Sequence, residues 1–302
     1  MKRIALFVIL AVSVAAGASA AATEAVPSKV GVNWDKGVYV AVAEARAKTT
    51  GAKSDPKLVA AAKLRAKEAV VSAILAALGS TPVDSFTKGE NYLKHAGVRK
   101  DVSAFIVSRC LKYSVAKAGK ATAVRAVAEV PIYRVFRLMV SSQETPWMAE
   151  KSGGSSKSLA EPEPEVDVQV SANKSAAEES PEPQVGPFTS LIVDTLGFNV
   201  QRAMSPKIRR EDGSEVWGTV KVDPDVVLDS GIVAYTKSME EARKNGRAGT
   251  NPLVVKAIGR AGGNFFCDAV VGDSDATLIL DENAKTHFCD ELKVIFVVDP
   301  KP

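Results

Sequence analysis

The chain has 302 residues, of which 46% are hydrophobic and 25% charged, and its formal net charge is +4. This composition is normal for a soluble globular protein. The two histidines exclude most acid–base and catalytic-triad schemes. Beyond the first twenty residues no run of eighteen apolar residues occurs, which excludes a transmembrane segment in the mature chain.

The first twenty residues predict a signal peptide. Lys2 and Arg3 precede an apolar stretch at 4–16 that is too short to span a bilayer, and Ala18-Ser19-Ala20 matches a small-residue cleavage signal. We expect cleavage between Ala20 and Ala21, giving a periplasmic or secreted protein. No cysteine follows this signal, so a lipid anchor at that point is not expected.

Residues 21–140 form a predicted basic domain. They contain 20 Lys and Arg against 9 Asp and Glu, a net charge of +11. A field of that sign favours anionic partners, which outside the cytoplasm are lipid head groups, cell-wall polymer or an acidic protein face. The compartment argues against nucleic acid. The simpler interpretation of the charge is a solvated, lysine-rich helix.

The basic domain has the predicted order β-α-β-α-β-β. Alternating valines predict a strand at 38–45, and Ser54-Asp55-Pro56 predicts the start of a helix that ends at Gly79. The other predicted elements are a strand at 83–87, a helix at 98–110 with Cys110 on its inner face, and a hairpin at 112–130 around Gly119-Lys120.

This domain resembles the family of small bacterial outer-membrane lipoproteins that includes flagellar assembly proteins P and T. The matching residues are 38–45, the alanine-rich helix around 62–70, the segment 83–87 and the closing hairpin, within roughly 32–135. The resemblance implies a non-catalytic domain that builds rings or disks at the flagellar base or coats the outer membrane. This chain lacks the lipid-attachment cysteine of that family and adds a second domain.

Residues 141–187 predict a disordered acidic linker. Pro, Glu, Ser and Gly dominate it, as in Glu161-Pro-Glu-Pro-Glu165, and such a composition buries too little apolar surface to fold. The predicted fold class is therefore α+β, with two small α+β domains joined by this linker, and with 1–20 as the signal peptide. The second domain, 188–302, is unassigned, and its Leu191–Asp194 segment and 207–216 hairpin resemble only uncharacterised envelope proteins.

The second domain has a mixed predicted order of strands and helices. Strands are predicted at 191–194, 232–235 and 292–298, a hairpin around Asp212-Gly213, and helices after Asp223-Pro224 and at 238–245 and 274–283. Strands at 253–258 and 264–271 are expected to pair through a glycine-rich turn containing Gly259, Gly262 and Gly263. These glycines do not match the spacing of a phosphate-binding loop.

Two of the three cysteines invite a disulfide. Cys267 and Cys289 lie in or beside neighbouring predicted strands, and an oxidising compartment favours a bond between them. The alternative is two buried thiols that never meet. A metal site at Cys267, His287 and Cys289 lacks a fourth ligand, and Asp268, Asp273 and Asp275 do not follow a calcium-loop pattern. We therefore expect no metal and no cofactor, with Asp273 and Asp275 in the first turn of a helix.

The sequence predicts a non-enzymatic envelope protein. The first hypothesis is a structural or assembly component of the flagellar basal body or outer membrane, which self-associates or binds other envelope proteins. The second is a soluble cell-wall-binding or ligand-binding protein that uses the basic domain as its contact surface. A carboxylate-only hydrolase is the third hypothesis, but acidic residues are too numerous to give it any specificity.

Overall fold

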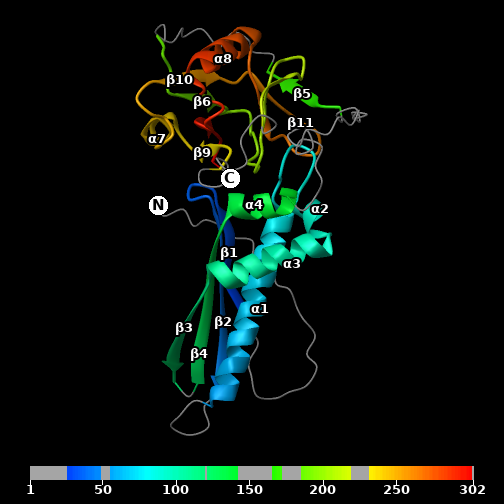
Figure 1. The fold of residues 1–302 in the computed structure, drawn as a ribbon, viewed down its shortest axis with the longest axis vertical. Helices are drawn as coiled ribbons and strands as arrows, with labels where there is room; N and C mark the ends of the chain where they lie inside the picture. Colours follow the sequence, from blue (N-terminus) through cyan, green and yellow to red (C-terminus); the bar gives the residue numbers. More distant parts are fainter. Residues whose placement is uncertain are drawn as a thin grey trace, which may run out of the picture.

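The computed structural model describes residues 26–48, 55–119, 121–141, 165–171, 185–218 and 231–300. The predicted cleavage site at Ala20 and Ala21 and the predicted helix after Asp223-Pro224 lie outside these residues. The chain is α+β, as predicted, and it forms two parts that stack end to end (Figure 1). Among the described residues, no helix combines the length and the apolar character needed to cross a membrane.

The first part is a four-stranded antiparallel sheet with the order β1-β2-β4-β3. Its strands are β1 (Val26–Asn33), β2 (Val38–Lys48), β3 (Leu111–Ala118) and β4 (Ala121–Pro131). Alternate residues of β2 and β4 are buried against one long helix, α1 (Pro56–Ser80). Small alanines on both elements let the helix approach the sheet closely.

Helix α1 begins where the sequence predicted. The carboxylate of Asp55 accepts a hydrogen bond from the backbone N–H of Lys57 at 2.8 Å, and Pro56 occupies the first turn. At about 1.5 Å per residue, its 25 residues span about 37 Å. The helix therefore runs along most of the sheet (Figure 1).

Short helices gather at one end of this sheet. They are α2 (Gly89–Leu93), α3 (Ala96–Phe105), its π-helical continuation η1 (Ile106–Cys110) and α4 (Ile132–Ser141). Cys110 is buried, as predicted. Helix α4 was not predicted. The predicted strand at 83–87 is wrong, because this segment is a loop with a single bridge between Pro82 and Lys88.

The second part holds two sheets. The first is parallel, with the order β10-β6-β13-β9, and comprises β6 (Ser190–Asp194), β9 (Ala234–Thr236), β10 (Pro252–Lys256) and β13 (Val294–Val297). The second has the order β5-β11-β12-β7-β8 and comprises β5 (Asp167–Val170), β7 (Ile208–Arg209), β8 (Glu215–Trp217), β11 (Gly259–Gly262) and β12 (Asp268–Val270). Helices α7 (Met239–Lys244) and α8 (Asp273–Thr286) complete this part.

Two strand pairings differ from the sequence prediction. Strand β10 does not pair with the 264–271 segment but lies parallel to β6, while β11 pairs with β12 in the other sheet. In addition, β5 pairs with β11 although it lies within the stretch predicted to be a linker. The rest of that stretch, 142–164 and 172–184, lies outside the described residues.

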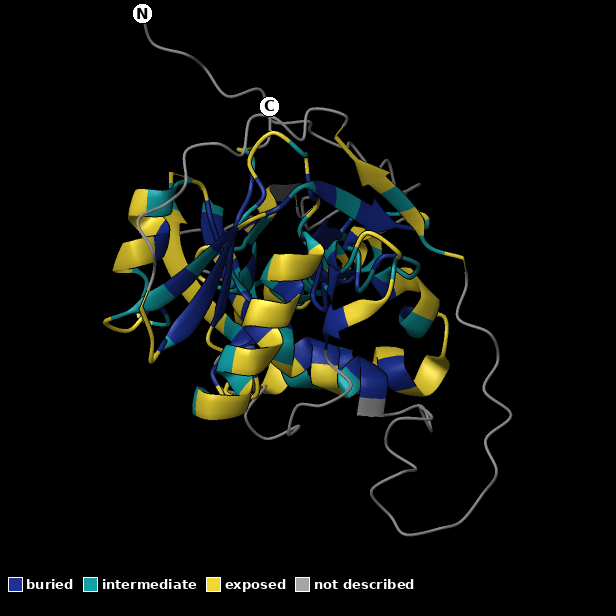
Figure 2. Cartoon of the chain, turned by 90° about the horizontal axis from the view of Figure 1, so that it is seen from above, coloured by how far each residue is buried: buried dark blue, intermediate teal, exposed yellow. Residues whose placement is uncertain are grey.

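One hydrophobic core extends through both parts. It joins Tyr39 and Ile74 of the first part to Phe188 and Phe296 of the second. A view along the long axis shows the buried strands at the centre and the exposed faces of the helices outside (Figure 2). A smaller cluster, which includes Ile192, Ala242 and Ile295, fills the opposite face of the parallel sheet.

The loop 82–88 of the first part makes most of the polar contacts between the parts. The carbonyl oxygens of Pro82 and Val83 accept the backbone N–H groups of Met204 and Ser205, at 3.2 and 2.7 Å. The carbonyl oxygen of Ser85 accepts two further backbone N–H groups, from Gly263 and Phe265. Carbonyl groups of this loop are therefore satisfied by the second part, whereas its N–H groups bond within the loop to Asp84 and Thr87.

Candidate functional site

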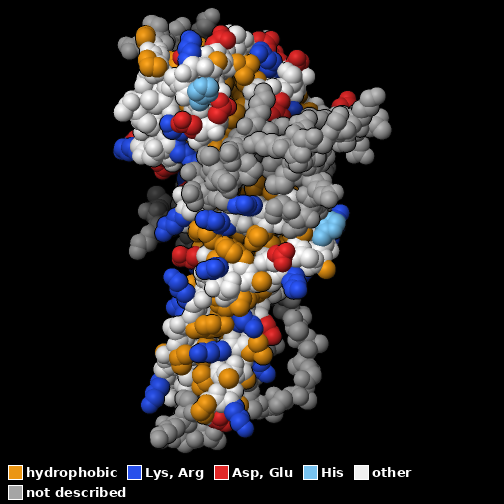
Figure 3. All heavy atoms as spheres, viewed as in Figure 1, with side chains coloured by type: hydrophobic (Ala, Val, Ile, Leu, Met, Phe, Trp, Pro, Cys, Tyr) orange, Lys and Arg blue, Asp and Glu red, His pale blue; other side chains and the backbone are white. Residues whose placement is uncertain are grey.

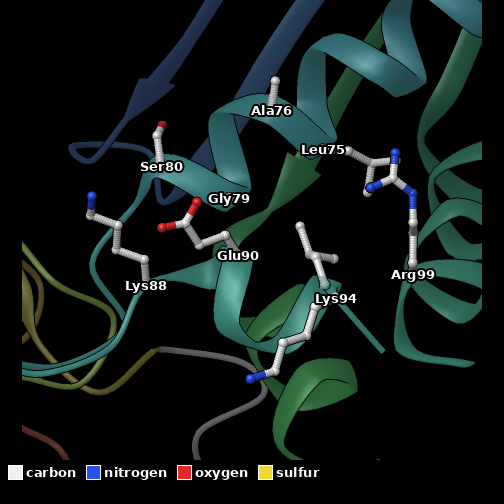
Figure 4. Close-up of a pocket in the computed structure, with 9 residues that line it drawn as sticks. Leu75, Ala76, Gly79, Ser80, Lys88, Glu90, Lys94 and Arg99 are labelled. Atoms are coloured by element: carbon white, nitrogen blue, oxygen red, sulfur yellow. The ribbon is translucent and has the colours of Figure 1, made fainter. Parts of the chain in front are cut away.

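A groove of about 440 Å³ opens beside the end of α1 in the first part. Its walls come from the last turns of α1, from α2 and from the start of α3 (Figure 4). The apolar lining residues are Leu75, Ala76, Gly79 and Leu93, and the polar ones are Ser80, Lys88, Glu90, Lys94 and Arg99.

Gly89 sets the distance between α1 and α2. A β-carbon at this residue would lie 2.1 Å from the carbonyl oxygen of Leu78, so only glycine lets the two helices approach this closely. The backbone N–H of Gly89 donates to the carbonyl oxygen of Thr81 at 3.0 Å. This contact fixes the start of α2 against the end of α1 and so defines one wall of the groove.

Lys88 connects the groove to the second part of the molecule. Its backbone N–H donates to the side-chain oxygen of Asn91 at 2.9 Å, which fixes the start of α2. Its ammonium group lies 5.0 Å from the centroid of the Phe265 ring, within the range of a cation–π contact. Lys88 is half-buried, whereas Lys94 and Arg99 are exposed.

The charged side chains of the groove have no ion-pair partners among the described residues. Within the described part of the chain, Lys88, Lys94 and Arg99 form no ion pair with a carboxylate, and Glu90 forms none with a cation. Glu90 lies between Lys88 and Arg99 in Figure 4. Three cations and one carboxylate give the groove a net charge of +2. Such a site attracts anions and contains no nucleophile–base pair.

The second candidate surface is the outer strand β3. Six of its eight residues are exposed, and within the described residues it pairs with β4 alone. Tyr113 and Val115 are exposed apolar residues on this strand, and the ammonium group of Lys63 lies 5.7 Å from the centroid of the Tyr113 ring. One side of the strand therefore has free backbone hydrogen-bonding groups next to apolar and cationic side chains.

The wider surface of the first part has the same character. Figure 3 shows Lys and Arg interleaved with hydrophobic side chains along the face that carries α1, with few Asp or Glu. The exposed large apolar residues of this part are Val30, Leu64, Val107, Tyr113 and Val115. Part of the excess positive charge, which the sequence showed as a regional total, is therefore visible on this face.

The structure does not contain the predicted disulfide. Cys267 and Cys289 are free, buried thiols, and burial raises the pKa of both. Cys267 directly precedes β12, whereas the carbonyl oxygen of Cys289 accepts the indole N–H of Trp217 in β8. Strand β7 lies between β12 and β8. The two cysteines therefore lie beside different, non-adjacent strands of this sheet.

The residues considered for metal binding have other partners. The ring Nδ1 of His287 lies 3.0 Å from Asp290, and Asp268 forms a buried ion pair with Arg209. Asp273 and Asp275 occupy the first turn of α8, which confirms the sequence prediction for them. Among the described residues, no group of three or more His, Cys, Asp or Glu side chains is arranged to hold a metal ion.

The glycines at 259–263 serve close packing. A β-carbon at Gly262 would lie 2.0 Å from the carbonyl oxygen of Phe265, and one at Gly263 would lie 2.2 Å from the ring of Phe86. Gly263 therefore lets the loop 82–88 of the first part reach the β11–β12 turn.

The second part of the chain is similar to a domain of a known protein. Residues 190–300 match a family model described as Treponema pallidum Tp0624, second domain. The matched region is similar to that domain over β6 to β13. It contains the whole parallel sheet but not β5, and it covers somewhat more than a third of the chain. No curated protein matches the chain.

The residues of the groove were not singled out from the sequence. They counted there only as part of the net charge of the basic domain. The signal that could have found them is local, because Lys94, His95, Arg99 and Lys100 lie within seven residues of one another. The positions of Glu90 and Lys88 in the groove depend on the packing of α2 against α1, which the sequence does not display.

Proposed function

We propose that this protein is a non-enzymatic component of the bacterial cell envelope that assembles with further copies of itself through the edge of its first sheet. The observation that carries the proposal is strand β3, which is eight residues long, exposed and paired on one side. An open strand of this length is a template for pairing with another chain. The resemblance of residues 32–135 to flagellar assembly and outer-membrane proteins supports a location at the flagellar base or the outer membrane.

The side chains of β3 allow such pairing. Lys112 and Lys117 are an odd number of positions apart and therefore point to opposite faces of the sheet. In antiparallel pairing of two β3 strands, residues directly opposite each other share a face. Lys112 of one copy then never stands directly opposite Lys117 of the other, and a lysine faces its own counterpart only in a register centred on that lysine. Tyr113 and Val115 supply apolar cross-strand contacts. The remaining repulsion between basic copies is weakened by salt.

The test compares two substitutions in the chain that starts at Ala21. Val115→Lys adds a charge to the edge strand, and Leu64→Lys adds the same charge on α1, at a residue of nearly equal exposure (50% for Val115 and 48% for Leu64). We expect sedimentation to show oligomers whose population rises with salt for the unsubstituted chain and for Leu64→Lys. Val115→Lys should remain a monomer.

Two outcomes would contradict the assembly proposal. One is an unsubstituted chain that stays monomeric at every salt concentration, and the other is equal loss of association in both variants. A monomer that is nevertheless retained by cell-wall polymer would favour the alternative function, a soluble cell-wall-binding protein. The unneutralised cations of the groove are the observation that favours this alternative.

A further inference from the structure

We propose that the groove between α1, α2 and α3 is a binding site for an organic phosphate, held by Lys94 and Arg99 with the help of Lys88. This inference goes beyond the assembly of copies, because the groove and β3 are formed by separate elements. The phosphate group can belong to a soluble phosphomonoester or to a lipid whose head group is a phosphomonoester. Both sources present the same chemistry to the groove.

The charge of the groove selects the ligand. Lys88, Lys94 and Arg99 line it without ion-pair partners among the described residues, and Glu90 is the one carboxylate in its lining. A phosphomonoester carries about −1.5 to −2 charges near neutral pH, which balances a net charge of +2. A carboxylate carries one negative charge and leaves the site half neutralised. The planar guanidinium of Arg99 can also donate two parallel hydrogen bonds to phosphate oxygens.

The shape of the groove implies more than an inorganic ion. Its volume of about 440 Å³ falls in the range of small-molecule sites and exceeds the size of one phosphate group. Leu75 and Leu93, both largely buried, present apolar surface beside the cations. This surface can cover the carbon part of an ester. Ser80 does not serve as a donor, since its hydroxyl already donates to the carbonyl oxygen of Ala77 at 2.9 Å.

The position of α2 fixes one wall of the groove. The close contact at Gly89 fixes this helix against α1, and the contact of Lys88 with Phe265 ties the loop before it to the second part. In Figure 4 the charged ends of Lys88, Lys94 and Arg99 point in different directions, so we expect a bound phosphate to draw the exposed side chains of Lys94 and Arg99 toward it. Glu90 is oriented into the same space and opposes any anion there (Figure 4).

The cations attract a phosphate and Glu90 repels it, so substitutions of the two kinds should change the affinity in opposite directions. Binding of inorganic phosphate and of glycerol phosphate to the chain that starts at Ala21 is measured by calorimetry at constant ionic strength. We expect glycerol phosphate to bind more tightly than inorganic phosphate. Arg99→Gln and Lys94→Gln should each weaken binding about tenfold. Glu90→Gln should strengthen it several-fold. The matched control is Lys100→Gln, which removes an exposed cation of α3 that does not line the groove.

A second arm distinguishes the source of the phosphate. Flotation with vesicles that contain phosphatidic acid, whose head group is a phosphomonoester, and with vesicles of phosphatidylcholine as the neutral control, measures binding to a lipid head group. Vesicle binding that Arg99→Gln abolishes, with no binding of soluble esters, supports the lipid source. The proposal is overturned if neither probe binds, if Arg99→Gln and Lys100→Gln have equal effects, or if acetate competes as well as phosphate.

Discussion

At the scale of single residues, the ion pair between Arg209 and Asp268 organises the second part. The guanidinium Nε lies 2.7 Å from a carboxylate oxygen, and the two side chains are 3% and 1% exposed. Asp268 also accepts the backbone N–H of Lys207, and Arg209 donates to the carbonyl oxygen of Gly213. Burial raises the pKa of Asp268, and the hydrogen bond and charge of Arg209 oppose that rise. The pair therefore joins β7, β12 and the Asp212-Gly213 turn.

Removal of the carboxylate should destabilise the protein strongly. Asp268→Ala leaves the guanidinium of Arg209 buried without a counter-charge, and we expect the free energy of unfolding to fall by about 3–5 kcal/mol. The control is Glu240→Ala. Glu240 pairs with Lys244 on the surface, with side chains 77% and 74% exposed, so its loss should be below about 1 kcal/mol. Urea denaturation measures the free energy of unfolding of both variants. Equal small decreases in the two would show that the buried pair does not support the fold.

At the scale of secondary structure, the contact between α1 and α2 depends on one missing side chain. The backbone of Leu78 occupies the space that a β-carbon of Gly89 would take. Gly97, in α3, has nothing within 4 Å of its hypothetical β-carbon. Close packing therefore requires a glycine at residue 89 but not at residue 97. Substitution by alanine should lower the stability at Gly89 and raise it at Gly97.

Gly89→Ala should move α2 away from α1. Relief of the overlap with Leu78 requires a backbone shift, for which we expect a loss of about 1–3 kcal/mol in the free energy of unfolding. Gly97→Ala should instead stabilise the protein by up to about 1 kcal/mol, because alanine is the better helix former. Thermal unfolding of both variants measures the difference. Stabilisation by Gly89→Ala would contradict the observed close packing.

Elements with clear local signals were predictable from the sequence. The proline after Asp55 identified the start of α1, and a glycine between two alternating runs identified the β3–β4 hairpin. Helix α4 was missed because Ile132–Val140 is a short apolar run, which strands and helices share. The loop 82–88 looked like a strand, yet its backbone bonds with residues far along the chain. The pairing of β10 with β6 also joins residues that are far apart in the sequence, and hydrophobic periodicity does not predict such a pairing.

At the scale of the whole molecule, the two parts meet over aromatic residues. The rings of Trp34 and Tyr235 contact edge to face, with centroids 5.4 Å apart. The hydroxyl of Tyr133, on α4, donates to the carbonyl oxygen of Val233 at 3.0 Å. Burial raises the pKa of Tyr133 to about 12, and it raises the pKa of Tyr235 and Tyr39 well above the ordinary value. This junction requires its tyrosines to be neutral.

Stability should therefore fall at alkaline pH. A group whose pKa is raised by folding contributes fully below its unfolded value, here 10, and loses its contribution as pH rises toward the folded value of about 12. We expect the denaturation midpoint to decrease across this window, together with delayed ionisation of tyrosine in ultraviolet absorbance. Tyr133→Phe removes one of these groups and should shift the decrease to higher pH. Ionisation of all five tyrosines near pH 10 with unchanged stability would contradict this account.

The loop 82–88 limits where the sequence can accept insertions or a break in the chain. It holds the two parts together through backbone groups and through Phe86, which packs over Gly263. The covalent route between them, from Ser141 to Glu165, is a separate segment. A peptide bond cut within 142–164 should therefore leave both pieces bound in one particle. Insertions in that segment should be tolerated, whereas one residue inserted between Pro82 and Lys88 should separate the two parts.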